Sequence, residues 1–315
     1  MPCSCGGDCV DQGAARVPMR VLITGSHGQV AQTVAQVAAS RPEVSALAMG
    51  RPALDLCSVP SIRRALFEIS PDIVINTAAY TDVDNAEREP QRAFELNADG
   101  AAAIAAEAAQ AKVPIIHLST DYVFDGTKPA PYTEEDKPAP ASVYGLSKLQ
   151  GEAAVANANA MHVILRTAWV YSPYGRNFVT TMIERARESE VLEVVDDQTG
   201  SPTYARHLAD VILSIAAQVV AGPAAPAWGV YHAAGSGGVS WCGLAKEVFA
   251  VSRKLGGPAA QIAPINGSQY PTVAARPQNA QLDCSKLERT FGLQLPDWRD
   301  GVADCVQRLL TEAPD

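Results

Sequence analysis

Tyr144 and Lys148 are the residues whose types and spacing most clearly allow chemistry. They lie four residues apart in Ser142–Lys148, a segment with a helical pattern, so both side chains leave one face of a helix. An ammonium group beside a phenol favours the phenolate, so we expect Lys148 to lower the Tyr144 pKa from about 10 towards neutrality. Such a tyrosine could exchange a proton with an alcohol or ketone. The spacing alone is weak evidence, because solvated surface pairs share it.

A glycine turn near the start of the chain could hold the cofactor that such a reaction requires. Val21–Thr24 has the pattern of a buried strand, and Gln29–Ala39 has that of a helix. Backbone N–H groups at such a helix start can approach a pyrophosphate, which predicts a nicotinamide cofactor. The residues expected against it are Gly25, His27, Gly28, Gln29 and Val30. Alanine replaces the third glycine of the usual motif, so the turn alone is a weak signal.

The residues after the second expected strand bear on the choice of cofactor. An acidic residue there would bind the ribose hydroxyls of NAD, whereas an arginine suits the extra phosphate of NADP. Arg51 stands at about this place, and Asp55 and Leu56 follow where they could flank the adenine. We therefore expect NADPH, with NADH as the alternative.

The order of elements predicts an α/β fold: a Rossmann-type doubly wound parallel sheet with a smaller α/β substrate lobe. The expected strands are Arg20–Thr24, Val44–Met49, Asp72–Asn76, Pro114–Ser119, His162–Arg166 and Leu192–Val195, with a further candidate at Gly229–Ala233. The expected helices are Gln29–Ala39, Val59–Ile69, Pro90–Ala111, Val143–Asn157, Asn177–Glu188, Ala205–Val219, Trp241–Leu255 and Ser285–Phe291. Ligands should gather at the carboxyl ends of the strands.

The same pattern suggests boundaries. Residues 1–18 read as a flexible leader, 19–173 as the NAD(P)-binding domain, completed by about 203–233, and 174–202 with 234–315 as the substrate-binding lobe. Cys3, Cys5 and Cys9 in the leader could bind a metal, but no fourth ligand with zinc-like spacing follows them. We favour the flexible leader.

Composition and charge narrow the functional classes. The 315 residues are 47% hydrophobic and 19% charged, with a net charge of −9, which is typical of a globular protein and argues against binding of nucleic acid or of an anionic membrane surface. No apolar run is long enough for a membrane span, and no secretory signal is evident, so we expect a cytoplasmic protein. His117 reads as a strand residue with satisfied hydrogen bonds.

Several segments together resemble the dTDP-4-dehydrorhamnose reductase family, a branch of the extended short-chain dehydrogenases/reductases. They are Gly25–Val30, Asn76–Glu87, Leu118–Gly126, Tyr144–Glu152, Leu165–Tyr171, Asn177–Phe178, Asp196–Thr203 and Arg276–Asp283. The resemblance implies NAD(P)H-dependent reduction of the C4 ketone of dTDP-4-dehydro-β-L-rhamnose to dTDP-L-rhamnose. It gives Tyr144 the role of proton donor, Lys148 that of holding the nicotinamide ribose, and Thr120 a hydrogen bond to the carbonyl oxygen.

The resemblance also implies roles for other residues. Ala78, Ala79 and Tyr80 would line the nicotinamide side, and Trp169 would close over the sugar. The remaining substrate candidates are Thr81, Val83, Ser119, Asp121, Tyr122, Asn177, Gln198 and Arg276. Trp169 could equally be ordinary packing, and Arg276 a surface arginine. Members of the family can use Mg²⁺ through glutamates at a dimer contact; the sequence does not place these ligands, and a homodimer is expected from the family alone.

Two alternatives remain. The substrate could be a related dTDP-4-keto-6-deoxysugar of a deoxysugar or antibiotic pathway, because the same motifs serve ketones of differing stereochemistry. The chain could also be a non-catalytic regulatory subunit like the methionine adenosyltransferase beta subunit, which keeps a Tyr-x-x-x-Lys pair. Thr120, Thr81 and Trp169 favour the reductase.

Overall fold

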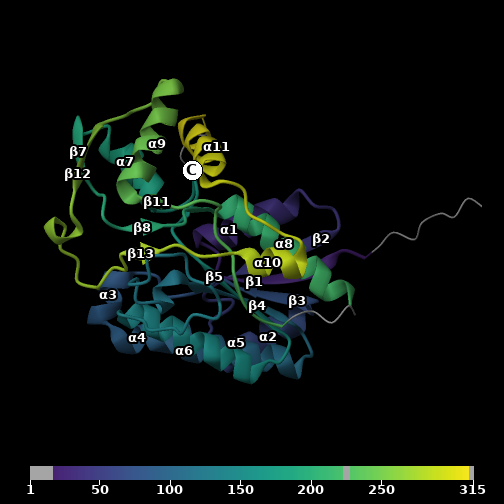
Figure 1. Cartoon of the computed structure of the whole chain (residues 1–315). Coiled ribbons are helices and arrows are strands. Elements are labelled where there is room, and N and C mark those ends of the chain that lie inside the picture. Colours follow the sequence, from purple (N-terminus) through teal and green to yellow (C-terminus); the bar gives the residue numbers. More distant parts are fainter. Residues whose placement is uncertain (1–16, 223–227, 312–315) are drawn as a thin grey trace, which may run out of the picture.

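The structure, a computed structural model, describes residues 17–222 and 228–311. Its centre is a six-stranded parallel sheet in the order β10-β5-β4-β3-β1-β2 (Figure 1). The strands are β1 (Met19–Thr24), β2 (Val44–Met49), β3 (Ile73–Asn76), β4 (Ile115–Thr120), β5 (His162–Thr167) and β10 (Gly229–His232). The chain reverses its direction across the sheet between β1 and β3, so the predicted doubly wound fold is confirmed. The predicted leader, with Cys3, Cys5 and Cys9, lies almost wholly outside the described residues.

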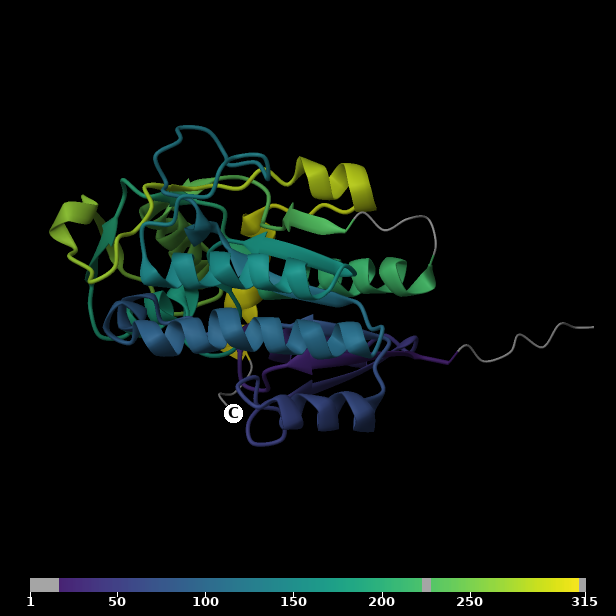
Figure 2. The same cartoon turned by 90° about the horizontal axis from the view of Figure 1, so that it is seen from below.

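Helices cover both faces of this sheet. One face carries α1 (Gln29–Ala39), α8 (Ala205–Ala221) and α10 (Ser285–Phe291), and the other carries α2 (Val59–Ile69), α5 (Ala101–Gln110) and α6 (Val143–Ala158). Figure 2 shows α2, α5 and α6 as neighbouring, roughly parallel helices. Alternate strand residues face opposite layers: Ile23 packs with α1 and α8, whereas Leu22 packs with α2 and α5. Because both faces are covered, the strands are almost continuously apolar.

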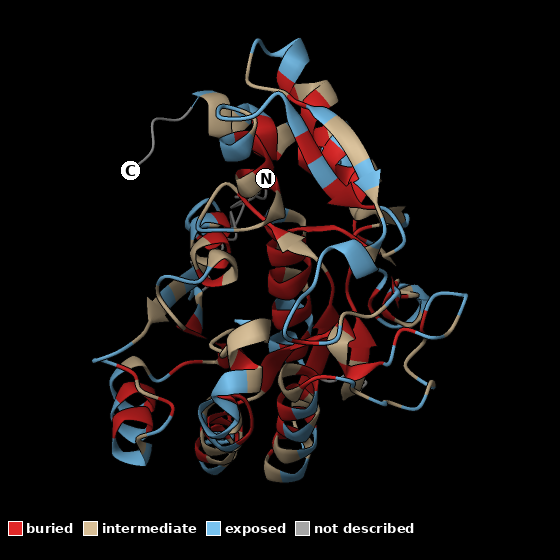
Figure 3. Cartoon of the chain, turned by 90° about the vertical axis from the view of Figure 1, so that its left-hand side faces the viewer, coloured by how far each residue is buried: buried red, intermediate tan, exposed pale blue. Residues whose placement is uncertain are grey.

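A second group of elements has its own apolar core. It contains α7 (Phe178–Arg185), β7 (Val191–Val195), α9 (Trp241–Lys254), β12 (Gln261–Ile265) and α11 (Trp298–Thr311). The predicted strand Leu192–Val195 forms as part of β7, but it pairs with β12 and not with the central sheet, whose last place belongs to β10. This strand lies within 174–202, the segment that the sequence pattern assigns to the substrate-binding lobe. β7 alternates exposed and buried residues, because only one of its faces is covered (Figure 3).

Short strand pairs connect the two groups. β6 (Val170–Tyr171) pairs with β9 (Thr203–Tyr204), and β8 (Thr199–Gly200) lies between β11 (Val239–Ser240) and β13 (Asn279–Ala280). Short 3-10 turns occur at η2 (Asp121–Val123) and η3 (Gly267–Gln269). No helix in the described part of the chain is long and apolar enough to cross a membrane.

The region predicted as one helix over Pro90–Ala111 is divided. It contains α4 (Pro90–Phe94), a π-helical turn η1 (Glu95–Gly100) and α5, and a further short helix, α3 (Val83–Arg88), precedes them. Within η1 the buried Asn97 side chain accepts the Tyr80 N–H at 2.7 Å and donates to the Ser147 hydroxyl on α6 at 2.9 Å. Gly151 of α6 lets the two elements meet, since a Cβ there would overlap the Asn97 carbonyl oxygen.

Candidate active site

A cavity of about 500 Å³ opens at the carboxyl ends of the central strands. It lies where the strand order reverses between β1 and β3, which is where ligands bind in open α/β sheets. Most of the predicted site residues line it: Gly28, Gln29, Val30, Ala79, Thr81, Val83, Ser119, Thr120, Asp121, Tyr122, Tyr144, Lys148, Trp169, Asn177 and Arg276. The predicted cofactor, substrate and catalytic groups thus share one enclosure.

Thr120, Tyr144 and Lys148 come together on one wall of this cavity. Thr120 ends β4, and the other two lie one turn apart on α6. α6 begins at Ser142, whose hydroxyl accepts the Gly145 N–H at 3.1 Å and so fixes the turn that carries Tyr144. The Tyr144 hydroxyl lies beside the Thr120 side chain on this wall. Any carbonyl oxygen bound there would meet both hydroxyl groups.

Burial controls the electrostatics of the Tyr144/Lys148 pair. It raises the pKa of the Tyr144 phenol above its ordinary value and lowers the pKa of Lys148 to about 8. The Lys148 ammonium donates to the Leu118 carbonyl oxygen at 2.6 Å. The expected lowering of the Tyr144 pKa by Lys148 is therefore wrong for this structure, because removal of the phenolate from water outweighs other effects.

Asp121 places a second proton-binding group in the site. Burial raises the pKa of this carboxyl to about 7. Its Oδ1 accepts the Thr120 hydroxyl at 2.9 Å, and its buried Oδ2 has no hydrogen-bond partner among the described residues. A carboxyl group with this pKa can bind or release a proton near neutral pH.

The glycine turn leads into α1 beside the cavity. Gly25 has a φ of +90°, a conformation that suits glycine. Gly28 forms the N-cap of α1 without any side-chain cap, so the first N–H groups of the helix stay available to an anion. Gln29 donates to the Val170 carbonyl at 3.2 Å, which ties α1 to β6. Gly25 itself and the exposed His27 do not line the cavity.

Other predicted cofactor residues lie away from the cavity wall. Arg51 is exposed just beyond β2, and Asp55 is half-buried nearby. Leu56 is buried in the core beneath α2 and α5. Ala78 packs against the same core. The Tyr80 side chain donates its hydroxyl to a surface glutamate, while its backbone is held by η1.

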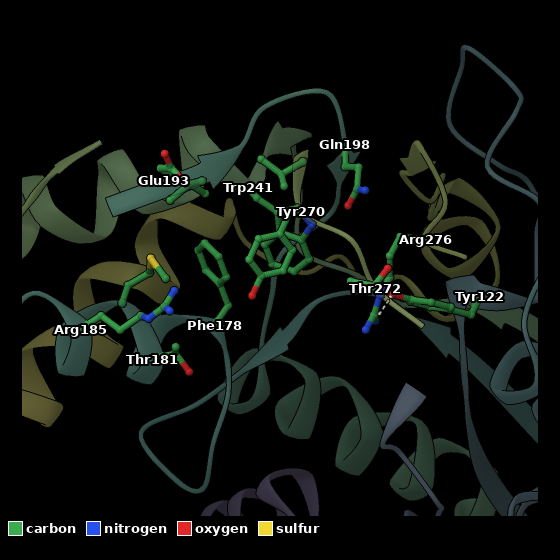
Figure 4. Close-up of a pocket in the computed structure, with 13 residues that line it drawn as sticks. Tyr122, Phe178, Thr181, Arg185, Glu193, Gln198, Trp241, Tyr270, Thr272 and Arg276 are labelled. Atoms are coloured by element: carbon green, nitrogen blue, oxygen red, sulfur yellow. Dashed lines mark hydrogen bonds between the residues drawn. The ribbon is translucent and has the colours of Figure 1, made fainter. Parts of the chain in front are cut away.

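A second cavity, of about 290 Å³, adjoins the first and shares four wall residues with it: Tyr122, Phe178, Trp241 and Arg276. Gln198 lines only the second one. In Figure 4, the rings of Phe178 on α7, Trp241 on α9 and Tyr270, which follows η3, lie along the cavity wall, with Arg276 at one end. The Arg276 guanidinium donates to the Tyr122 hydroxyl and to the Asp84 carboxylate, both at 2.8 Å. Arg276 is thus a partly buried, paired cation and not a free surface arginine.

Comparison with known proteins identifies the family. A family model for the RmlD substrate binding domain matches residues 19–311. A dTDP-4-dehydrorhamnose reductase from Sinorhizobium fredii is 48% identical over 94% of this chain and 100% of its own length. The chain belongs to the dTDP-4-dehydrorhamnose reductase family.

One solved structure and one further relative are also similar to this chain. The crystal structure of a dTDP-4-dehydrorhamnose reductase from Bacillus anthracis in complex with NADP has a TM-score of 0.85 and 33% identity, covering 94% of this chain and 100% of that one. A probable dTDP-4,6-dihydroxy-2-methyloxan-3-one 4-ketoreductase from Streptomyces antibioticus is 38% identical over 93% of this chain and 96% of its own length.

Several predicted substrate residues of this reductase-family chain also have structural contacts. Asn177 forms the capping box of α7 with Thr180. Ser119 donates to the buried Glu152 carboxylate at 2.5 Å. The Trp169 ring stacks on that of Trp241. Each of these three residues also lines the large cavity, so its structural contact does not remove it from the cavity wall.

The sequence reasoning missed some wall residues. They are Thr77, Arg176 and Trp241 in the large cavity and Arg185, Glu193, Tyr270 and Thr272 in the smaller one. The predicted helix Trp241–Leu255 placed Trp241 at a helix start, but no local signal placed its ring against that of Trp169. The described residues hold no group of three or more His, Cys, Asp or Glu side chains placed to bind a metal, so Mg²⁺, which the sequence left open, finds no support among them.

Proposed function

We propose that this chain reduces the C4 ketone of dTDP-4-dehydro-β-L-rhamnose to dTDP-L-rhamnose, with NAD(P)H as the reductant and NADPH preferred. The observation that carries the proposal is the common cavity that holds Thr120, Tyr144 and Lys148 together with the open N-terminus of α1. A carbonyl beside the first group and a dinucleotide on the second would lie close together. The names of the relatives and the NADP complex of the Bacillus anthracis protein support the assignment.

The residues have complementary roles in this reaction. The nicotinamide cofactor, when bound, supplies the hydride for C4, and negative charge then develops on the carbonyl oxygen. The Tyr144 hydroxyl donates the proton to that oxygen, and the Thr120 hydroxyl orients it. Lys148, whose pKa is about 8, carries an ammonium group near neutral pH that would hold the nicotinamide ribose. The N–H groups at Gly28 and Gln29 would hold the pyrophosphate of the cofactor.

The nucleotide half of the substrate fits the smaller cavity. Its aromatic side chains, Phe178, Trp241 and Tyr270, offer surfaces for a pyrimidine ring. Arg276 stands at the junction of the two cavities, where the diphosphate would pass, and its charge suits that group. This division favours 19–173 with 203–233 as the cofactor-binding part and 174–202 with 234–315 as the substrate lobe, except that α10 packs against the central sheet.

The Streptomyces antibioticus relative supports a second candidate, reduction of a related dTDP-4-keto-6-deoxysugar. The discriminating experiment is a panel of dTDP-4-keto-6-deoxysugars assayed by NADPH oxidation, with product stereochemistry read by NMR. We expect the highest kcat/KM for dTDP-4-dehydro-β-L-rhamnose. Equal or better turnover of another epimer would favour the second candidate. No reduction of any ketosugar, together with binding to a methionine adenosyltransferase, would overturn both.

A further inference from the structure

Three buried polar side chains form a row across the central sheet. Thr24 of β1 is paired with Asn76 of β3, and Asn76 is paired with His117 of β4, so the three occupy matching positions on neighbouring strands. Each is at most 1% exposed. The Thr24 hydroxyl lies 2.5 Å from Asn76 Oδ1, and Asn76 Nδ2 lies 2.9 Å from His117 Nδ1. The row ends at Lys148 of α6, whose Nζ is 3.4 Å from His117 Nε2.

The direction of these hydrogen bonds is fixed at Thr24. Its oxygen accepts two backbone N–H groups, those of Thr77 and Ala78, both at 3.1 Å. A hydroxyl has two lone pairs and one hydrogen, so this hydrogen must go to Asn76 Oδ1. A reversed Asn76 amide would present a third donor to an oxygen that has no lone pair left. Asn76 therefore offers its Nδ2 to His117.

This direction determines the tautomer of His117. Since Nδ1 accepts from Asn76, a neutral imidazole carries its proton on Nε2. Burial lowers the pKa of His117 well below its ordinary value, and Lys148 acts in the same direction. The ring is therefore neutral, and its Nε2–H points towards Lys148.

An N–H group cannot accept a hydrogen bond from the Lys148 ammonium. Among the residues that the structure describes, Nζ has one firm buried acceptor, the Leu118 carbonyl oxygen. The titratable groups that act on it from the packed elements are His117 of β4 and, on α6 itself, Glu152. The carboxylate of Glu152 is occupied by Arg166 of β5, at 2.7 and 2.9 Å. The remaining N–H bonds of Lys148 can therefore find an acceptor only in the cavity, which Lys148 lines.

We propose that Thr24, Asn76 and His117 are positioning residues. They hold His117 as the Nε2–H tautomer, deny Lys148 a second buried acceptor, and so direct its free N–H bonds into the cavity where the cofactor would bind. The role rests on the proposed reductase function, but the tautomer itself does not. None of the three touches the reacting atoms; they act through Lys148. The row also joins the last residue before the glycine turn to the catalytic lysine.

NMR of protein carrying ¹⁵N-labelled histidine tests the tautomer without any activity measurement. The His117 signals are assigned by their loss in His117→Gln. We expect a neutral ring with its proton on Nε2 between about pH 6 and 8, where an ordinary histidine would titrate. A proton on Nδ1, or an imidazolium in this range, would overturn the proposal even if ketosugar reduction is found. If His117 shows the expected tautomer but the protein reduces no ketosugar, only the proposed function is contradicted.

A substitution that reverses the hydrogen bond between residue 76 and His117 tests how the row affects Lys148. Asn76→Asp accepts from both neighbours, so the His117 proton should move to Nδ1 and leave Nε2 as an acceptor for Lys148. We expect the basic pKa in the pH profile of kcat/KM to rise by about one unit. Thr24→Ser keeps the hydroxyl and is the matched control, with tautomer and profile unchanged; Thr24→Val removes the donor and should give mixed tautomers. An unchanged tautomer and profile in folded Asn76→Asp would refute the proposal.

Discussion

The indole of Trp169 lies face to face with the indole of Trp241, with ring centroids 3.4 Å apart and planes 8° apart. Trp169 follows β5 with a φ of +47°, a conformation that costs a non-glycine residue about 1–3 kcal/mol. Gly200 leaves room for its ring, since a Cβ there would overlap it. Trp241 is the first residue of α9, so the stack joins the central sheet to the second core across the large cavity.

Trp241→Ala should therefore weaken substrate binding more than it slows the chemistry. The stack that holds Trp169 in its strained conformation would be lost, and an aromatic pair contributes about 0.5–1.5 kcal/mol beyond its buried area. We expect KM for the ketosugar to rise about tenfold, with kcat changed much less. Steady-state kinetics measure both, and Trp241→Phe should restore most of the affinity. A KM equal to that of the parent would argue against the stack as a wall of the substrate site.

Tyr144→Phe should remove the proton donor and leave the cofactor site intact. We expect kcat to fall by about 10²-fold or more, because general acid catalysis contributes on that scale. NADPH affinity, measured by fluorescence titration, should stay within about twofold, since the phenyl ring keeps the packing against Tyr122. Near-normal turnover would remove Tyr144 from the mechanism.

Arg51→Ala tests the basis of cofactor preference. Arg51 is exposed beyond the carboxyl end of β2. If it binds the 2′-phosphate, its loss should weaken NADPH about tenfold and leave NADH unchanged, because a hydrogen bond to a charged group contributes about 1.5–3 kcal/mol. The matched control is Arg64→Ala, which removes a different exposed arginine, one that lies on α2. The same NADPH-to-NADH ratio in both variants would show that Arg51 does not read the phosphate.

Asp121 should make stability depend on pH. Its pKa in the folded protein is about 7, above its ordinary 3.8, so the carboxyl stabilises the fold only while it is protonated. That contribution is fully present below about pH 4 and is lost as the pH rises through about 7. Relative to Asp121→Asn, the parent should lose as much as about 4 kcal/mol of unfolding free energy over this range. Urea unfolding of both proteins near pH 4.5 and pH 8 measures this difference. Parallel stability curves would show that Asp121 does not titrate in this way.

Much of the fold follows from local patterns. The bounds of β2, α1 and α2 agree with those predicted, because continuous apolar runs and helical periodicity mark them clearly. Local patterns do not predict which strands pair with each other. Leu192–Val195 and Gly229–His232 are both short apolar runs, and only the tertiary packing decides that the second one joins the central sheet.

The candidate site divides in the same way. Thr120, Tyr144 and Lys148 carry their chemistry in their residue types, and the end of β4 and the packing of α6 bring them to one edge of the sheet. The stack of Trp169 on Trp241 depends on contacts between distant segments, so the sequence could not reveal it. The pKa of Tyr144 depends on how completely the site is enclosed, which neighbouring residue types do not tell.

The position of β10 has a consequence for redesign. The chain leaves the central sheet after β5, forms α7 and β7, returns through α8 to add β10, and then leaves again for α9. No single cut separates the two cores, so neither can be expressed or exchanged between homologues as one contiguous module. New sugar specificity would have to be introduced by substitutions within the loops that face the cavity. A chimera joined at one crossover after β5 would pair the β10 edge strand of one parent with the sheet of the other.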